Sequence, residues 1–161
     1  MVEVDLKNKP KELLEINPYA KVPVLVDGEA VIYESAIINE YLEEKFPEVA
    51  LMPGDLLERA RARIWIDFCN TRLQAAGSDI AHGRNVEKAR EKLAEHLLTL
   101  DHALANRRYL AGDYSLAEVT FIPFFTRRER YGIALDSALP HVKRWVDSLL
   151  ARPAVQSTLS P

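Results

Sequence analysis

The sequence predicts a small α/β unit followed by an all-helical domain, and three observations support this fold class. Strand-like patterns occur only within the first 47 residues. Residues 47–54 contain two prolines and a glycine, which is typical of a linker. Beyond that stretch, apolar residues recur at helical spacing. We therefore expect a partial α/β domain over residues 1–47, a linker over 48–54 and an all-α domain over 55–161.

The first domain is expected to have the order β-α-β-β-α. Residues 2–6 alternate between apolar and polar side chains, which predicts a short strand. Residues 11–16 fit a short helix that ends at an Asn-Pro pair. Residues 22–26 and 30–33 predict a hairpin around an Asp-Gly turn. A helix then begins at Ser35 and ends before Pro47.

Capping signals predict the first two helices of the second domain. Asp55 and Glu58 form a capping box at the start of a helix that runs to about Gly77. Asn85 caps a second helix that runs to about Asn106.

Two further start signals follow, so that we expect four or five helices in all. Ser115 and Glu118 form a second capping box, and Tyr114 with Val119 is placed as a hydrophobic staple. Pro140 suits the first position of a last helix. That helix carries an apolar stripe: Leu139, Val142, Trp145, Val146 and Leu149.

Composition excludes several classes of protein. The chain has 161 residues, a net charge of −3 and a single cysteine, Cys69, which rules out an internal disulfide framework and a multi-cysteine zinc site. Its acidic balance argues against general nucleic-acid affinity. It has no membrane-length apolar run and no signal-like start. We expect a cytoplasmic protein that has no membrane partner.

The Val22-Pro23 pair has two interpretations. Proline lacks a backbone donor and is usually confined to the start or edge of a strand. Alternatively, a cis-proline would turn the amide and carbonyl of Val22 outward, toward a peptide-like ligand.

Glu34 and Ser35 stand where a predicted strand meets a predicted helix, and they too have two interpretations. One of them could simply cap the helix. Alternatively, the free amides of the helix start attract a carboxylate while Glu34 pairs with an ammonium group, which would suit an amino-acid head group.

These motifs together resemble the glutathione transferase superfamily. The resemblance rests on residues 17–28 (NPYAKVPVLVDG), 33–42 (YESAIINEYL), 109–118 (YLAGDYSLAE) and shorter matches at 51–53, 59–63, 139–145 and 152–155. It implies an incomplete thioredoxin-like domain followed by the all-helical transferase domain. It also implies that glutathione is a co-substrate. We expect no metal site. The four histidines show no metal-binding spacing.

The resemblance also implies the glutathione-binding residues. Val22 with Pro23 would hold the cysteinyl backbone, Glu34 and Ser35 the γ-glutamyl end, and Lys21 the glycyl carboxylate. In the family, Ser115 and Glu118 match a structural capping box, although aspartate is usual at the second position.

Family members have a strand and a helix before the strand that residues 2–6 resemble, and the catalytic tyrosine, serine or cysteine follows that first strand. No residue of this chain matches that catalytic position. Cys69 lies within a predicted helix and is interpreted as a buried core residue. A truncated sequence, a gap filled by another chain through domain swapping, or a rearranged remnant would each explain the difference.

The leading functional interpretation is a transferase that conjugates glutathione to a small hydrophobic electrophile, if the segment with the catalytic residue is supplied. Trp65 and Phe68 would then line the second-substrate pocket, although core packing is the alternative. Residues 34–47, followed by residues 51–53, also resemble bacterial stringent starvation protein A, a transferase-fold regulator that binds RNA polymerase. A non-catalytic protein-assembly module is a third option.

The charge distribution favours a homodimer. Residues 1–54 carry a net charge of −6 and residues 55–161 a net charge of +3. In the family, the helix that carries Arg59, Arg61 and Arg63 faces the partner's first domain, so we expect a dimer that salt weakens. We expect no direct contact with nucleic acid.

Overall fold

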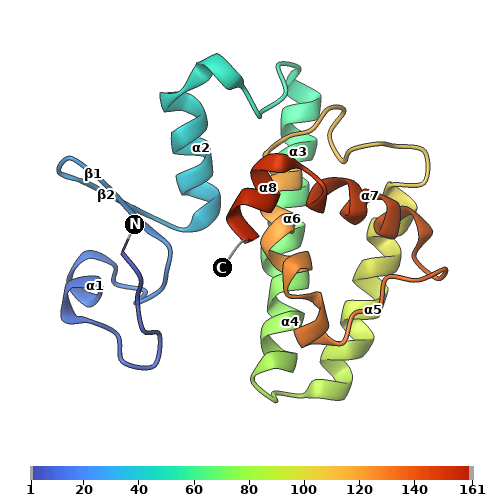
Figure 1. Ribbon diagram of the computed structural model, residues 1–161, viewed down its shortest axis with the longest axis horizontal. Coiled ribbons are helices and arrows are strands. Elements are labelled where there is room, and N and C mark those ends of the chain that lie inside the picture. Colours follow the sequence, from blue (N-terminus) through green and yellow to red (C-terminus); the bar gives the residue numbers. More distant parts are fainter. Residues whose placement is uncertain (1, 160–161) are drawn as a thin grey trace. The chain divides into compact units, whose positions relative to one another are not determined.

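The structure is a computed structural model that describes residues 2–159, and it divides into two compact units, Met1–Ala50 and Leu51–Pro161 (Figure 1). None of the helices in the described part of the chain is long and apolar enough to cross a membrane.

The small unit has the order α-β-β-α and ends in a short 3-10 turn. Its elements are α1 (Lys11–Ile16), β1 (Val24–Asp27), β2 (Ala30–Tyr33), α2 (Ser35–Lys45) and the 3-10 turn Pro47–Val49. The two strands form an antiparallel hairpin in which Val24 pairs with Tyr33 and Asp27 pairs with Ala30. Gly28 has a φ of +62° in the turn, a conformation that glycine adopts without steric cost.

The predicted strand at residues 2–6 is wrong. These residues have no regular secondary structure, and the sheet described in the structure contains only β1 and β2. Alternating apolar residues make a strand possible, but a strand forms only when a neighbouring strand receives its hydrogen bonds.

The second unit is all helical. Its elements are α3 (Leu56–Phe68), a π turn (Cys69–Leu73), α4 (Gln74–Ala81), α5 (Val86–Ala103), α6 (Leu116–Thr126), a 3-10 turn (Arg128–Tyr131), α7 (Pro140–Leu150) and α8 (Pro153–Leu159). The described residues therefore contain six α-helices here, where four or five were predicted. The π turn divides the helix expected over 55–77, and Pro153 begins an additional short helix.

The core of this unit surrounds α6, which packs against α3 and α7 (Figure 1). Phe121 and Trp145 meet edge to face, with ring centroids 5.2 Å apart, and Phe124 meets Phe125 in the same way at 5.2 Å. The five residues of the predicted apolar stripe on α7 are all buried. A Cβ on Gly77 would lie 3.2 Å from the Phe124 ring, so glycine allows α4 to approach α6 closely.

The predicted capping signals have mixed outcomes. The box of Ser115 and Glu118 is confirmed at the start of α6. Asp55 caps α3 by accepting hydrogen bonds from two backbone amides, but the Glu58 side chain contacts Arg61, so only half of the predicted box is confirmed. Asn85 precedes α5 as predicted, yet its left-handed backbone (φ 44°) and lack of a side-chain cap bond contradict the predicted mechanism.

Candidate functional site

The hairpin register brings two predicted binding segments to one end of the small sheet. Val24 is the first residue of β1, and its partner Tyr33 is the last residue of β2. Residues facing each other in an antiparallel pair have Cα atoms about 5 Å apart. The Val22-Pro23 pair comes just before Val24, and Glu34 comes just after Tyr33. Both therefore lie at the same end of the hairpin.

The peptide bond between Val22 and Pro23 is cis, as the second interpretation of this pair required. Val22 lies outside β1 and is 43% exposed. No hydrogen bond to its backbone N–H or C=O is found within residues 2–159. Both groups are therefore available to an extended, peptide-like ligand.

Glu34 has a strained backbone at the start of α2. Its φ of 71° lies in a region that non-glycine residues seldom adopt, at a cost of about 1–3 kcal/mol. Its carbonyl accepts a hydrogen bond from the Ile38 amide, while its side chain makes no capping bond. Strain of this kind is concentrated at ligand sites, because the surrounding fold holds the residue in position for binding.

Ser35 is the first residue of α2 rather than its N-cap, because Glu34 occupies the cap position. The first amides of a helix have no intrahelical acceptor and attract a carboxylate. Ser35 and Glu34 are both exposed. The junction therefore presents an anion-attracting helix start beside a free carboxylate, which matches an amino-acid head group.

Asn17 organises the loop that carries Lys21. Its side chain, which is only 1% exposed, donates to the Lys21 carbonyl at 2.8 Å and accepts from the Tyr19 amide at 2.9 Å. Ala20, between them, has a φ of 52°. In the sequence this asparagine marks a helix stop and begins the motif of residues 17–28, but its role in holding the loop was not predicted. Its ability to hydrogen bond to the backbone two residues on is the signal that would have identified it.

A hydrogen bond and an ion pair connect the hairpin to α2. The Tyr41 hydroxyl donates to Asp27 Oδ2 at 2.6 Å, and Lys45 forms an ion pair with the same oxygen. The hydrogen bonds from Lys45 and Tyr41 hold the pKa of Asp27 below its usual value, and the pKa of Lys45 is raised in return. Tyr19 and Tyr33 add an edge-to-face contact at 5.2 Å near the site end of the hairpin.

Trp65 and Phe68, the predicted second-substrate residues, lie on α3 in the helical unit. They meet edge to face at 5.1 Å, and Phe68 also contacts the His96 ring of α5 at 5.7 Å. Both are partly exposed. Phe68 therefore contributes to packing between α3 and α5, and both side chains leave part of their surface in contact with solvent.

Cys69 is buried, as predicted for a core residue. Its Sγ lies 3.7 Å from the Thr120 carbonyl oxygen, and burial raises its pKa to about 12. A thiol with this pKa is not a thiolate at neutral pH and is not a reactive nucleophile. Within the described residues, no group of three or more His, Cys, Asp or Glu side chains could hold a metal ion.

The chain thus combines a thioredoxin-like N-terminal part, which includes a cis-proline loop, with an all-helical C-terminal domain. Residues 1–50 match the glutathione S-transferase N-terminal domain and residues 67–153 match the glutathione S-transferase C-terminal domain. The chain therefore belongs to the glutathione S-transferase family.

Individual relatives agree with this assignment. A probable glutathione S-transferase of Nicotiana tabacum is 33% identical over 99% of this chain and 76% of its own length. Glutathione S-transferase 3 of Zea mays is 30% identical over 99% of this chain and 81% of its own length. The structure of rice GST1 in complex with glutathione has a TM-score of 0.85 at 28% identity and covers 99% of this chain and 78% of the rice chain.

Proposed function

We propose that the protein binds glutathione at the cis-proline end of its hairpin. We further propose that, together with the segment that carries the family's catalytic residue, it conjugates glutathione to a small hydrophobic electrophile. The observation that carries the proposal is the pairing of Val24 with Tyr33. This pairing sets the free backbone of Val22 and the strained Glu34 at one end of the hairpin.

The site's chemistry suits the three parts of this tripeptide. The N–H and C=O of Val22 can form strand-like hydrogen bonds with the cysteinyl backbone of glutathione. The start of α2 at Ser35 can receive the γ-glutamyl carboxylate, and Glu34 can pair with its ammonium group. Lys21 is exposed and supplies a positive charge for the glycyl carboxylate. The rice relative was solved in complex with glutathione, which supports the same ligand here.

Calorimetric titration with glutathione tests the binding proposal. Glu34→Ala should weaken binding by about tenfold, because it removes one charge-assisted hydrogen bond. Glu29→Ala is the matched control, since Glu29 lies in the turn at the opposite end of the hairpin. Equal affinities of the two variants would exclude Glu34 from the site.

The substitution Glu34→Gly distinguishes the backbone strain at position 34 from the role of the Glu34 carboxylate in glutathione recognition. Glu34→Gly should raise the free energy of unfolding, because glycine adopts a positive φ without steric cost. It should at the same time weaken glutathione binding as much as Glu34→Ala does. If Glu34→Gly bound glutathione normally, the carboxylate would have no role in recognition.

Conjugation is tested separately with chlorodinitrobenzene. The 161-residue chain is expected to bind glutathione without appreciable turnover, because none of its residues matches the family's catalytic position. Appreciable turnover would show that a residue of this chain activates the thiol. Absence of both binding and turnover would contradict the proposed site and favour a regulatory or assembly role.

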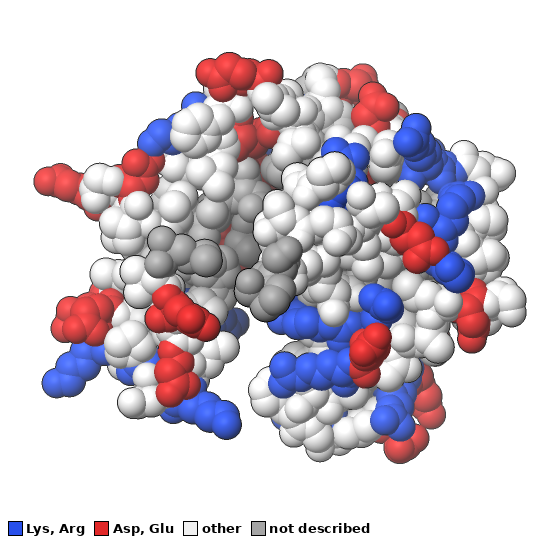
Figure 2. All heavy atoms as spheres, viewed as in Figure 1, with Lys and Arg blue, Asp and Glu red and all other residues white. Residues whose placement is uncertain are grey.

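We also propose a homodimer in the cytoplasm, with the swapped form as one arrangement of it. The net charges of −6 and +3 in the two parts of the sequence support an electrostatic contribution to association. On the face shown in Figure 2 both signs are interspersed, so this imbalance does not form one uniform patch on that face. Sedimentation at low and high salt tests this, and a monomer under both conditions would contradict it.

A further inference from the structure

A pocket in the helical unit lies beside the π turn and has no part in the proposed glutathione site. It has a volume of about 280 Å³, and its walls come from the π turn, α4 and α5. Ala75, Ala76 and Ala89 line it with small apolar groups. Arg72, Lys92 and His96 line it with basic or polar groups.

The π turn determines which residues reach this pocket. The Gln74 amide donates to the Cys69 carbonyl, a hydrogen bond that spans one residue more than in an α-helix. Arg72 lies within this turn, and Ala75 and Ala76 follow in the first turn of α4. Single π turns within α-helices are frequently found at functional sites.

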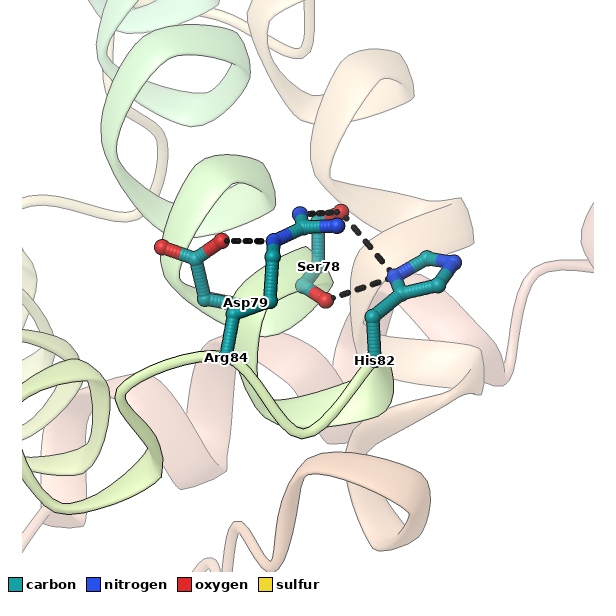
Figure 3. A network of polar contacts seen from close by, with 4 residues as sticks. All are labelled: Ser78, Asp79, His82 and Arg84. Atoms are coloured by element: carbon teal, nitrogen blue, oxygen red, sulfur yellow. Dashed lines mark hydrogen bonds and ion pairs between the residues drawn. The ribbon is translucent and has the colours of Figure 1, made fainter.

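The two cations of the pocket lack carboxylate partners. Within residues 2–159, neither Arg72 nor Lys92 has an acidic group at ion-pair distance. Asp79 also lines the pocket, but its carboxylate accepts a hydrogen bond from Arg84 at 2.9 Å, as Figure 3 shows. Glu95 is the remaining acid, so that Arg72, Lys92 and Glu95 together leave a net charge of +1.

The pKa of His96 depends on the charges that line the pocket. Its pKa is lowered first by partial burial and then by the positive charge of Arg72. Glu95 acts in the opposite direction, and Lys92 lowers the pKa further. The ring is held edge-on against Phe68, with centroids 5.7 Å apart. Its protonation therefore responds to any charge that enters the pocket.

We propose that this pocket binds a small monocarboxylate, with the carboxylate between Arg72 and Lys92 and the apolar body against the three alanines. The volume lies below the roughly 300 Å³ at which pockets for drug-sized ligands begin, so the ligand is smaller. The net charge of +1 matches one carboxylate. Inorganic phosphate, which carries on average more than one negative charge at pH 7, is disfavoured because Glu95 repels the excess charge.

NMR titration of His96 in the full chain tests the proposal with benzoate as the probe. The bound carboxylate offsets the charges of Arg72 and Lys92, so the pKa of His96 should rise when benzoate is added. Sodium chloride at equal ionic strength and the neutral analogue benzamide should produce a smaller rise or none. If chloride matched benzoate, the effect would be screening and the proposal would be wrong.

Matched variants locate the site. Arg72→Gln and Lys92→Gln should each weaken benzoate binding by about tenfold, because each removes a charge-assisted hydrogen bond. Lys88→Gln is the control, because Lys88 is an exposed lysine of α5 that does not line the pocket. Circular dichroism should show unchanged helix content in all three. Equal losses in all three variants would contradict the site, and phosphate binding tighter than benzoate would contradict the monocarboxylate assignment.

Discussion

The two units use buried polar groups in different ways. Among the described residues of the small unit, Asn17 is the buried polar residue and only Leu13 and Ile38 are buried apolar residues. Asn17 holds a loop that leads to the ligand site. In the helical unit, Asp101 and Glu118 are buried within a large apolar core and bind helix starts. The buried polar residue of the small unit therefore positions a loop of the ligand site, whereas the buried polar residues of the helical unit stabilise helix starts.

Glu118 should show the largest effect on stability. Its carboxylate accepts hydrogen bonds from the Leu110 amide at 2.8 Å, the Ser115 amide at 3.0 Å and the Ser115 hydroxyl at 2.9 Å. Glu118→Ala leaves these buried donors without an acceptor and should lower the free energy of unfolding by about 3 kcal/mol. Urea unfolding followed by tryptophan fluorescence measures this, because both tryptophans lie in the helical unit.

Glu91→Ala is the control for this substitution, because Glu91 is exposed on α5. It should change the free energy of unfolding by less than about 0.5 kcal/mol. Similar losses in both variants would mean that the buried network contributes nothing specific.

Asp101 should have the next largest effect. It lies at the end of α5 and accepts hydrogen bonds from the amides of His141 at 2.8 Å and Val142 at 2.9 Å, in the first turn of α7. It thus caps a helix whose own N-cap residue, Leu139, has no capping side chain. Asp101→Ala should lower the free energy of unfolding by about 2 kcal/mol in the same assay.

Asp101→Asn tests the mechanism of that loss. The asparagine side-chain oxygen can still accept from the two amides, so this variant should recover most of the stability. No recovery would show that Asp101 does not act as a cap.

These two networks show how far the sequence predicts this fold. The box of Ser115 and Glu118 was predictable because its partners are three residues apart. The cap from Asp101 to Val142 was not, since 41 residues separate them and only the packing of α5 against α7 brings them together. The π turn was also missed, because apolar periodicity does not distinguish a continuous helix from one with an inserted residue.

The small unit shows the same limit at its site. The cis bond before Pro23 was one of two interpretations of its local motif, and the helix start at Ser35 was predicted directly. The positive φ of Glu34 has no such motif, because the surrounding fold imposes it. The strand expected at residues 2–6 was wrong, since pairing depends on a neighbouring strand rather than on alternation.

Substitution of Asn17 should affect glutathione binding more than the stability of the helical unit. Asn17→Ala removes the bonds to the Tyr19 amide and the Lys21 carbonyl. The loop before Val22 should loosen, and glutathione affinity measured by calorimetry should fall by about tenfold. Urea unfolding reported by the two tryptophans should remain within about 0.5 kcal/mol of the wild type.

Asn8→Ala is the control for the loop, because Asn8 is exposed and lies outside it. This variant should leave both affinity and stability unchanged. The tryptophans report the free energy of unfolding of the helical unit. If Asn17→Ala lowered it as much as Asp101→Ala does, the proposed difference between the two units would be wrong.

The pH dependence of Glu118 should be the smallest effect, and it tests whether its network holds a charged or a neutral carboxyl group. Burial raises the pKa of Glu118 above its ordinary 4.5, so the folded state binds the proton more tightly than the unfolded chain. This contribution to stability is fully present below pH 4.5 and is lost as the pH rises through the folded-state pKa. Glu118→Gln cannot titrate, and the lowered pKa of Asp27 affects both proteins equally.

The free energy of unfolding of the wild type, relative to Glu118→Gln, should therefore fall as the pH is raised from 4 to 7. If the wild type instead gained stability relative to this variant over that range, the hydrogen bonds from Leu110 and Ser115 would outweigh burial. The carboxylate would then be held ionised in the folded state, and the network of the helical unit would be based on a buried charge.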